Sequence, residues 1–188
     1  METPLGEGPF IVGARPDGSP ILGYEVARYE ELAPNRHRPR ADSNIPVAEW
    51  TKVEGHHGVP SVLAQHLVWK YREGRAPAVS LPVDQHKATT SALVTWLSRV
   101  PAAYRTDGKP DAQKVAANPK MVDEVVTVMW DAAKVPQNVR VLMRQKFEQY
   151  RLEQEYERRR EEYDVALSQW KLDYGPAIDL PPPKQPPD

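Results

Sequence analysis

The chain has 188 residues, of which 40% are hydrophobic and 27% charged, which suits one modest core with appendages. It contains no cysteine, which excludes disulfides, thiol catalysis and zinc sites built on cysteine. The net charge of −1 gives no general support for nucleic-acid binding, so any such binding requires a local basic patch.

The N-terminal residues do not resemble a targeting signal. Residues 1–4 are Met-Glu-Thr-Pro, and no apolar stretch of the kind found in signal peptides follows them. No apolar run anywhere approaches the roughly 18 residues of a membrane span. We therefore expect a soluble protein with no membrane partner, and secretion would have to use a route without a cleaved signal peptide.

Residues 1–50 are interpreted as an N-terminal hairpin and loop segment. Two apolar stretches, 9–13 and 20–24, flank Pro16-Asp17-Gly18, a sequence that favours a tight turn. This pattern predicts a short β-hairpin. Residues 35–40 then form a basic loop, in which His37 is interpreted as solvated rather than as a phosphate ligand.

Residues 51–135 alternate between helical and extended patterns, as in a small α+β core. Pro60 suits the first turn of a helix, and Gly74 suits a C-terminal cap. Pro101 and the pair Asn118-Pro119 interrupt the later helical patterns. The predicted elements in chain order are a helix over 60–73, a strand over 78–82, a helix over 85–99, a loop over 104–110 and one or two helices over 111–134.

Residues 136–176 are predicted to form one long C-terminal helix, which Pro136 opens and which runs from Gln137 to about Tyr174. Within 151–162, glutamates and arginines stand three or four residues apart, at the spacing of helical ion pairs. A near-heptad apolar stripe should pack on the 85–135 helices or on a partner, because such patches are seldom left in water. The stripe consists of Leu152, Tyr156, Tyr163, Leu167, Trp170 and Tyr174. Residues 177–188 are a proline-rich tail.

Three of the five histidines fall in two short blocks, Gly55-His56-His57-Gly58 and the segment around His86. Neutral imidazole is the commonest metal ligand and a common general base near neutral pH. An adjacent pair can divide these tasks, which points to a metal-assisted hydrolase, although loop histidines packed near a helix start are the alternative. On a regular strand His56 and His57 would face opposite sides, so we expect a bend there, for which the two glycines are suited.

Three features occur together in this region: the pattern His56-His57-x-x-Pro60-Ser61, a strand-like run at 79–82, and His86 entering a helix with Thr89-Thr90. This combination resembles the divergent HNH-like nucleases. These ββα-metal enzymes occur as toxin domains of bacterial secreted effectors. The resemblance covers about residues 54–97. It implies that His56 and His86 bind a divalent metal ion, that His57 activates water, and that the helix near His86 presents its positive end to phosphate.

The sequence departs from that pattern in three places. No asparagine lies between the two blocks to orient His57, and Thr90 stands where some members carry another histidine. A helix is also predicted between the blocks, where the compact motif has only a hairpin. Glu54 and Asp84 are candidate carboxylate ligands of the metal, and Thr90 is a candidate supporting residue.

Four cations near the two blocks are candidates for binding nucleic acid, namely Lys70, Arg72, Arg75 and Lys87. The alternative is an ordinary solvated helix face. Trp69 and Tyr71 could stack on bases, but aromatic residues at helical spacing belong more often to a core. His66, in the predicted first helix, is interpreted as a packed or surface residue.

The resemblance implies a mainly helical α+β protein with a small ββα-metal motif, flanking helices and a long C-terminal helix. It also implies a metal-dependent nuclease, with DNA as the favoured substrate and with Mg, Zn, Mn or Ni as the metal. Such a toxin acts in the cytoplasm of a target cell and is restrained by a cognate immunity protein.

Two other functions stay open from the sequence. The first is a non-enzymatic interaction protein that binds a partner through the 137–174 helix. The second is a metal-independent RNase toxin in which His57 and His86 serve as base and acid. The nuclease requires His56, His57 and His86 to converge, open to solvent and beside cations. The interaction protein requires an exposed apolar stripe on the long helix and scattered histidines.

Overall fold

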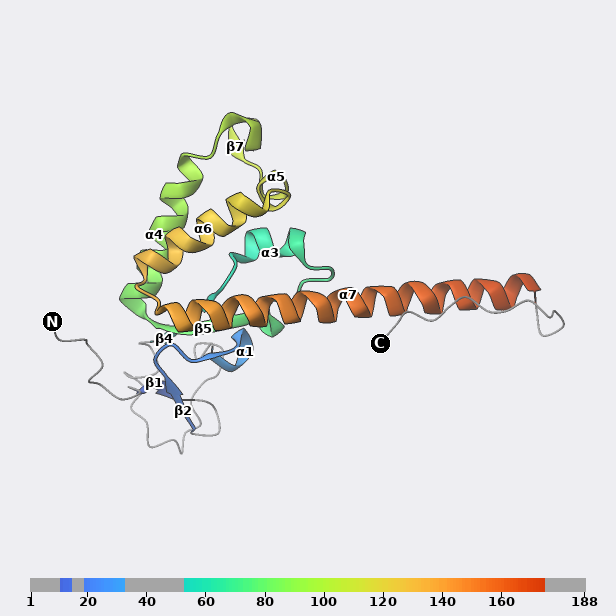
Figure 1. Ribbon diagram of the computed structural model, residues 1–188, viewed down its shortest axis with the longest axis horizontal. Coiled ribbons are helices and arrows are strands. Elements are labelled where there is room, and N and C mark those ends of the chain that lie inside the picture. Colours follow the sequence, from blue (N-terminus) through green and yellow to red (C-terminus); the bar gives the residue numbers. More distant parts are fainter. Residues whose placement is uncertain (1–10, 15–18, 33–52, 175–188) are drawn as a thin grey trace.

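The computed structural model describes residues 11–14, 19–32 and 53–174; the basic loop with His37 and the proline-rich tail lie outside the described residues. The sequence-based expectation of a mainly helical α+β protein is confirmed (Figure 1). The strands are β1 (Ile11–Ala14), β2 (Pro20–Leu22), β3 (Val26–Arg28), β4 (Val53–His57), β5 (Pro77–Pro82), β6 (Arg105–Thr106) and β7 (Lys109–Pro110). The helices are α1 (Tyr29–Leu32), α3 (Ser61–Leu67), η2 (Glu73–Arg75), α4 (Val83–Ser98), η3 (Ala102–Tyr104), α5 (Ala112–Ala116), α6 (Pro119–Ala132) and α7 (Gln137–Tyr174).

The sheet that carries the histidine pair has three antiparallel strands in the order β3-β5-β4. Strand β5 is central and fully paired, which matches its nearly continuous burial, and the expected strand over 78–82 is confirmed. Helix α4 begins directly after β5. Strands β4 and β5 and helix α4 therefore form a ββα unit, in which α3 and η2 are inserted between the two strands.

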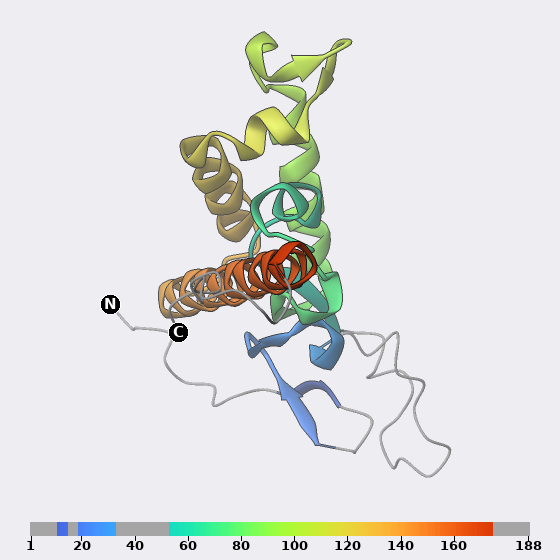
Figure 2. The same cartoon turned by 90° about the vertical axis from the view of Figure 1, so that its right-hand side faces the viewer.

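The main core lies between this sheet and the helices α4, α6 and α7. Val79 and Leu81 of β5 pack with Trp96, Trp130 and Met143, one residue from each of the three helices. The other face of β5 carries Ala78, which belongs to a smaller cluster with Ile21 and Leu32. In Figure 2, α7 is seen nearly end-on, with α4 and α6 above it and α1 and the β1–β2 hairpin below.

Proline and asparagine fix the boundaries of α6 as the sequence predicted. Asn118 is the N-cap and its side chain accepts a hydrogen bond from the Lys120 N–H, while Pro119 takes the first helical position. Asp111 caps α5 in the same way, through the N–H groups of Gln113 and Lys114. Such caps satisfy backbone donors that have no partner within the helix. The expected break between two helices at 118–119 is thus confirmed.

The expected helix over 60–73 is wrong in length, because α3 ends at Leu67. Val68 is extended and buried, and it packs with Ala76 and with Tyr150 of α7. Lys70 follows with a φ of 45°, outside the helical region. Gly74 lies inside η2 instead of capping a long helix. Packing of Val68 against α7 outweighs the helical preference of the segment.

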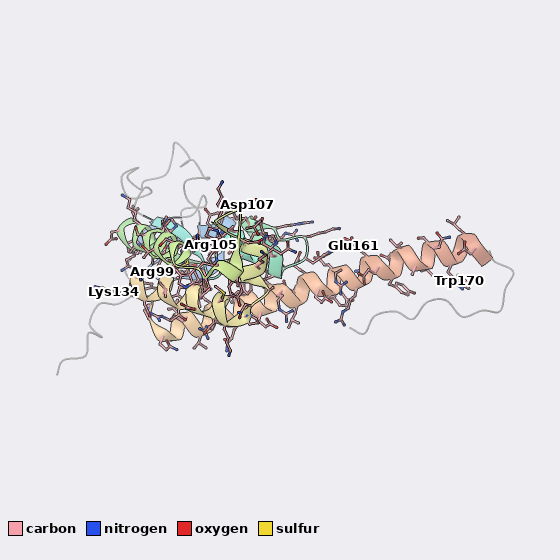
Figure 3. The ribbon with its side chains drawn as sticks, turned by 90° about the horizontal axis from the view of Figure 1, so that it is seen from above. Arg99, Arg105, Asp107, Lys134, Glu161 and Trp170 are labelled. Atoms are coloured by element: carbon pink, nitrogen blue, oxygen red, sulfur yellow. The ribbon has the colours of Figure 1, made fainter. Side chains whose placement is uncertain are left out.

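The loop expected over 104–110 contains a small hairpin, β6–β7. Its two central residues, Asp107 and Gly108, have φ values of 51° and 75°. Positive φ at both positions is the requirement of the tightest hairpin turn, for which Asp-Gly is a preferred sequence. Arg105 holds the hairpin to the end of α4 by donating hydrogen bonds to the carbonyls of Leu97 and Ser98. Arg105 and Asp107 are labelled in Figure 3.

The long helix α7 matches the expected 137–174 segment, but only its first half packs on the body. Val139, Met143, Tyr150 and Gln154 are buried, and none of the residues 155–173, whose burial the structure describes, is buried. Figures 1 and 3 show the second half projecting beyond the domain, with Glu161 and Trp170 along it.

The apolar stripe of α7 was expected to pack either on the 85–135 helices or on a partner. It does not pack on those helices, since Leu152 is 54% exposed and Tyr156 is also exposed. The buried residues of α7 instead form a separate line, because the side of the helix that meets the sheet is the Tyr150–Gln154 side. A partner for the stripe stays a prediction. Among the described helices, none is both long enough and apolar enough to cross a membrane.

Candidate active site

The two histidine blocks meet at one pocket on the outer strand of the described three-stranded sheet. His56 and His57 end β4, where they pair with Val79 and Ala78 of β5, and His86 lies in the first turns of α4. The pocket has a volume of about 290 Å³. Its lining comprises Tyr29, Gly55, His56, His57, Pro60, Ser61, Val62, Glu73, His86, Thr89, Thr90, Leu93 and Met129.

The bend expected between His56 and His57 is absent, because β4 stays regular through both residues. Neighbouring residues of a strand face opposite sides of the sheet. His56 therefore shares the face of Val79, on the side of α4, whereas His57 shares the face of Ala78, on the side of α1. Both histidines still border one pocket, because β4 is an edge strand of the sheet and the pocket extends around that edge to both faces.

His56 is held as a neutral imidazole. His56 is 6% exposed, and its burial lowers the pKa of the imidazole from 6.5 to about 3. The nearby His86 and His57 contribute to the same lowering. The Nδ1 of His56 lies 3.3 Å from the Thr89 hydroxyl oxygen, and that hydroxyl donates to the His86 carbonyl at 2.7 Å. A hydroxyl has one proton to donate. The His56 Nδ1 therefore carries the proton, and its Nε2 carries the lone pair.

His86 stands beside His56 in an edge-to-face arrangement, with ring centres 5.7 Å apart and an angle of 76° between the planes. It is half-buried, and Thr89 and Thr90 both donate their hydroxyl protons to its backbone carbonyl. The ring of His86 reaches the pocket from α4, while that of His56 reaches it from β4. These two histidines therefore converge, although His56 is buried rather than open to solvent.

His57 has different neighbours. Its ring stacks on Tyr29 of α1, with centres 4.3 Å apart and planes 26° apart. Its Nε2 lies 3.5 Å from Oε1 of Glu73. Gly55 permits this arrangement, because a Cβ at that position would come 2.9 Å from the Tyr29 ring. His57 thus lies between a stacked tyrosine ring and a carboxylate, whereas His56 lies beside the ring of His86 and the hydroxyl of Thr89.

The sequence did not indicate four of these pocket residues as part of the site: Tyr29, Ser61, Glu73 and Thr89. Ser61 and Thr89 lay within the motif that was quoted, but neither was given a role. Thr89 stands three residues after His86, a spacing that places both on one side of a helix, so helical periodicity alone could have indicated it. Tyr29 and Glu73 lie 28 and 16 positions from His57, and only the tertiary structure brings them to it.

Of the remaining candidates for the metal site, Thr90 lines the histidine pocket and Asp84 does not. Asp84 is exposed at the start of α4 and does not line the pocket, and the side chain of Glu54 lies outside the described residues. Thr90 is exposed but borders the pocket. His66 is exposed on α3 and does not line the pocket, in agreement with its interpretation as a surface residue. A role of Glu54, Asp84 or Thr90 in metal binding stays a prediction.

The donors present fit one side of a metal site. The Nε2 atom of His56 is buried and has no hydrogen-bond partner among the described residues, and it carries a lone pair. Two imidazoles that share one ion have ring centres about 5–6 Å apart, because metal–nitrogen bonds are about 2.0–2.1 Å long. The His56–His86 separation lies in this range. Within the described residues, however, no group of three or more His, Cys, Asp or Glu side chains could hold a metal ion.

The four candidate cations lie outside the pocket. Lys70 forms an ion pair of 2.6 Å with Glu161 of α7 and lies over the Trp69 ring. Arg75 borders a second hollow, together with Arg28 and Lys146. Arg72 and Lys87 are exposed. Binding of nucleic acid by these cations stays a prediction.

One family of known proteins matches the chain, and the match covers more than half of it. The family is Tox-SHH, described as an HNH/Endo VII superfamily toxin with a SHH signature, and it aligns with residues 51–152. That range contains β4, β5 and α4, all three pocket histidines and the first part of α7. The residue before the His56-His57 pair is Gly55 rather than a serine. No solved structure matches the chain.

Proposed function

Because this chain belongs to the HNH/Endo VII superfamily of toxins with a SHH signature, we propose that it is a metal-dependent nuclease that hydrolyses phosphodiester bonds in DNA. The observation that carries the proposal is the ββα unit, which brings His56, His57 and His86 to one pocket. The family supports a nuclease toxin, and the geometry supports a division of labour among the three histidines.

His56 and His86 are the proposed metal-binding pair. His56 presents a buried lone pair on Nε2, held in that tautomer by Thr89, and the ring of His86 lies beside it. With only two protein ligands, other coordination positions would be left for water and for phosphate oxygens, as in sites where the substrate completes the coordination. A bound divalent ion supplies stabilisation of negative charge on the phosphate and on the leaving oxygen.

His57 is the proposed general base. It lies on the other side of β4 from His56, so its ring nitrogens are not committed to the same ligand position. In hydrolysis it accepts a proton from the attacking water, while the water oxygen bonds to phosphorus and the ester P–O bond breaks. Histidine is the side chain whose unperturbed pKa lies nearest to neutral pH, so histidine is the residue type that most often serves as a general base.

The biological setting is proposed from the family alone. A toxin domain of this kind would be delivered as part of a bacterial effector into the cytoplasm of a target cell. A cognate immunity protein would restrain it in the producing cell. The family description gives the toxin and its superfamily. Delivery, the antibacterial role and the immunity partner are our inferences.

Plasmid cleavage with purified protein tests the proposal. We expect cleavage in the presence of Mg²⁺, Mn²⁺, Zn²⁺ or Ni²⁺ and none in EDTA. His57→Ala should reduce the rate roughly 10²–10⁴-fold and retain metal binding, since loss of a general base has that magnitude. His86→Ala should weaken metal binding in a calorimetric titration. His66→Ala, an exposed histidine outside the pocket, is the matched control and should behave as wild type.

The outcomes separate the alternatives. Cleavage of RNA that survives EDTA would replace the metal enzyme by the RNase with His57 and His86 as base and acid. Equal metal affinity in His57→Ala and His86→Ala would mean that the two roles are misassigned. Absence of cleavage of any nucleic acid would refute the nuclease.

A second candidate function rests on α7. Its projecting half exposes Val165 to 69% and Leu172 to 80%, and Leu152 of the stripe is also exposed. Isolated apolar residues on a surface are ordinary, but a projecting helix that leaves several large apolar side chains exposed favours a packing partner. This function is compatible with the nuclease, because α7 contributes no residue to the histidine pocket.

A further inference from the structure

A carboxylate contacts the histidine that we assign as the base. Glu73 reaches His57 from η2, in the segment inserted between the two strands of the ββα unit. We propose that Glu73 is the positioning residue of His57: it fixes the orientation and tautomer of the imidazole and stabilises the cation formed during hydrolysis. This inference rests on the proposed nuclease function and deepens it.

The carboxylate of Glu73 is itself held by a chain of hydroxyl groups. Ser61, at the start of α3, donates to Glu73 Oε1 at 3.4 Å, and the Tyr71 hydroxyl donates to Ser61 Oγ at 3.3 Å. The same Oε1 atom is the one that lies 3.5 Å from His57 Nε2. Burial raises the pKa of Tyr71 to about 12, so this hydroxyl remains a donor at neutral pH. The chain runs from Tyr71 through Ser61 and Glu73 to His57.

The backbone beneath Glu73 is fixed by the long helix. The hydroxyl of Tyr150 accepts a hydrogen bond from the Arg72 N–H at 2.9 Å and donates one to the Arg72 carbonyl at 3.2 Å. Tyr150 is 5% exposed and packs with Ala76, which follows η2. The residues on both sides of η2 are therefore anchored to α7. Glu73 is 47% exposed at its side chain, yet its main chain is clamped.

On the opposite flank, Tyr29 stacks on the His57 ring. Stacking fixes the plane of the imidazole, and the carboxylate selects which nitrogen carries the proton. A proton on Nε2 faces Glu73, which leaves the lone pair on Nδ1 to accept the proton of the attacking water. The imidazolium that results is stabilised by the negative carboxylate, and no proton passes to Glu73, as in other acid–histidine pairs. The leaving oxygen takes its proton from solvent.

This pairing accounts for one departure noted in the sequence. The HNH-like pattern has an asparagine between the histidine blocks, and this chain has none. Glu73 lies between the blocks in sequence and beside the base in space. A carboxylate can both orient the ring and balance the charge on it, whereas an amide can only orient it.

Cleavage kinetics of Glu73→Gln test the inference. The substitution keeps the shape of the side chain and removes its charge. We expect kcat to fall about 10–100-fold, the range typical of residues that orient a functional histidine, with KM and the metal requirement unchanged. Glu161→Gln, an exposed and ion-paired glutamate on α7, is the matched control and should keep full activity. In a His57→Ala background, Glu73→Gln should cause no further loss, because Glu73 acts through His57.

A measurement without substrate or metal gives an independent reading. Nitrogen chemical shifts of labelled histidines in EDTA, at about pH 8 where an unperturbed imidazole is neutral, report the tautomer of His57. We expect the Nε2–H form in wild type and in Glu161→Gln, and a mixture in Glu73→Gln. An active wild type whose Glu73→Gln variant has unchanged kcat and unchanged tautomer would overturn the inference alone.

Two further results have distinct meanings. A Glu73→Gln variant that needs more metal for half-maximal rate, with kcat restored by that metal, would make Glu73 a ligand and not a positioning residue. A wild-type protein that cuts no nucleic acid refutes the proposed function, and with it the catalytic part of the inference. The chemical shifts then still decide whether Glu73 sets the His57 tautomer.

Discussion

Removal of the Thr89 hydroxyl is the most informative single perturbation of the proposed metal-binding pair. Thr89 is 1% exposed, and its hydroxyl oxygen accepts the Nδ1 proton of His56. Thr89→Val keeps the branched shape and removes the acceptor. A buried donor left without a partner costs about 1–3 kcal/mol, so we expect the free energy of unfolding in EDTA to fall by that amount.

The same substitution should weaken metal binding. Without Thr89, the proton of His56 is free to move to Nε2, which would occupy the lone pair needed by the metal. Loss of a residue that orients a metal-binding histidine typically reduces affinity about 10–100-fold. Urea unfolding in EDTA and calorimetric titration with Ni²⁺ measure the two effects separately.

Thr90→Val is the matched control, since it removes the same group one position along the helix. Thr90 is exposed, and its hydroxyl donates a hydrogen bond to the His86 carbonyl at 3.3 Å. Its removal should change stability by less than about 0.5 kcal/mol and leave metal affinity unaltered. If the two valine variants are indistinguishable in both measurements, the argument that Thr89 sets the tautomer of His56 is refuted.

Three further predictions follow from burial and hydrogen bonding. The folded protein lowers the pKa of His56 to about 3, so as the pH falls below about 6.5 only the unfolded chain binds a proton on this imidazole. The free energy of unfolding of the metal-free protein should therefore fall by up to about 1.4 kcal/mol per pH unit. Urea unfolding between about pH 7 and 5 should show a weaker pH dependence for His56→Gln. Tyr150→Phe should cost about 1–3 kcal/mol by removing both hydrogen bonds to Arg72, whereas Tyr156→Phe, at an exposed position, should not; equal unfolding midpoints would contradict this. A chain that ends at residue 164 should keep the thermal midpoint of the full chain, because none of the described residues 155–173 is buried, while a chain that ends at 149 should melt at lower temperature.

Local chemistry in the sequence located several elements. Asn118-Pro119 and Pro136 act through their own backbone and side-chain geometry, so the starts of α6 and α7 could be predicted. The strand over 78–82 was equally evident, because four of its five residues are apolar, as expected of a central strand that is buried on both faces. Such signals need no knowledge of the rest of the molecule.

Elements that depend on distant packing could not be predicted in this way. The end of α3 at Leu67 follows from contacts of Val68 with Tyr150, which is 82 residues away. The β6–β7 hairpin has a preferred turn sequence at Asp107-Gly108, but its strands are two residues each and carry no apolar alternation. The sequence around residues 60–73 therefore still predicted a longer helix, and the sequence around residues 104–110 still predicted a loop.

The candidate site shows the same division. The histidines were evident because they are few and clustered, and the structure brings all three to one pocket. Their partners were not evident: Thr89 was passed over for Thr90, and Glu73 was treated only as the end of a helix. A residue that supports another side chain is defined by a contact in the folded protein. Its amino-acid type and its position in the sequence do not predict that contact.

The placement of His56 and His57 on opposite sides of β4 makes strand register a determinant of chemistry. Five pairs, from Val53 opposite Pro82 to His57 opposite Ala78, set this alignment. A slip of one residue along β5 would turn every side chain of β4 to the other side. His57 would then enter the space beside His86 and Thr89, and His56 would leave it. Each histidine would then lose the neighbours on which its proposed role depends, so a shift of register could silence the site while leaving every histidine in the sequence.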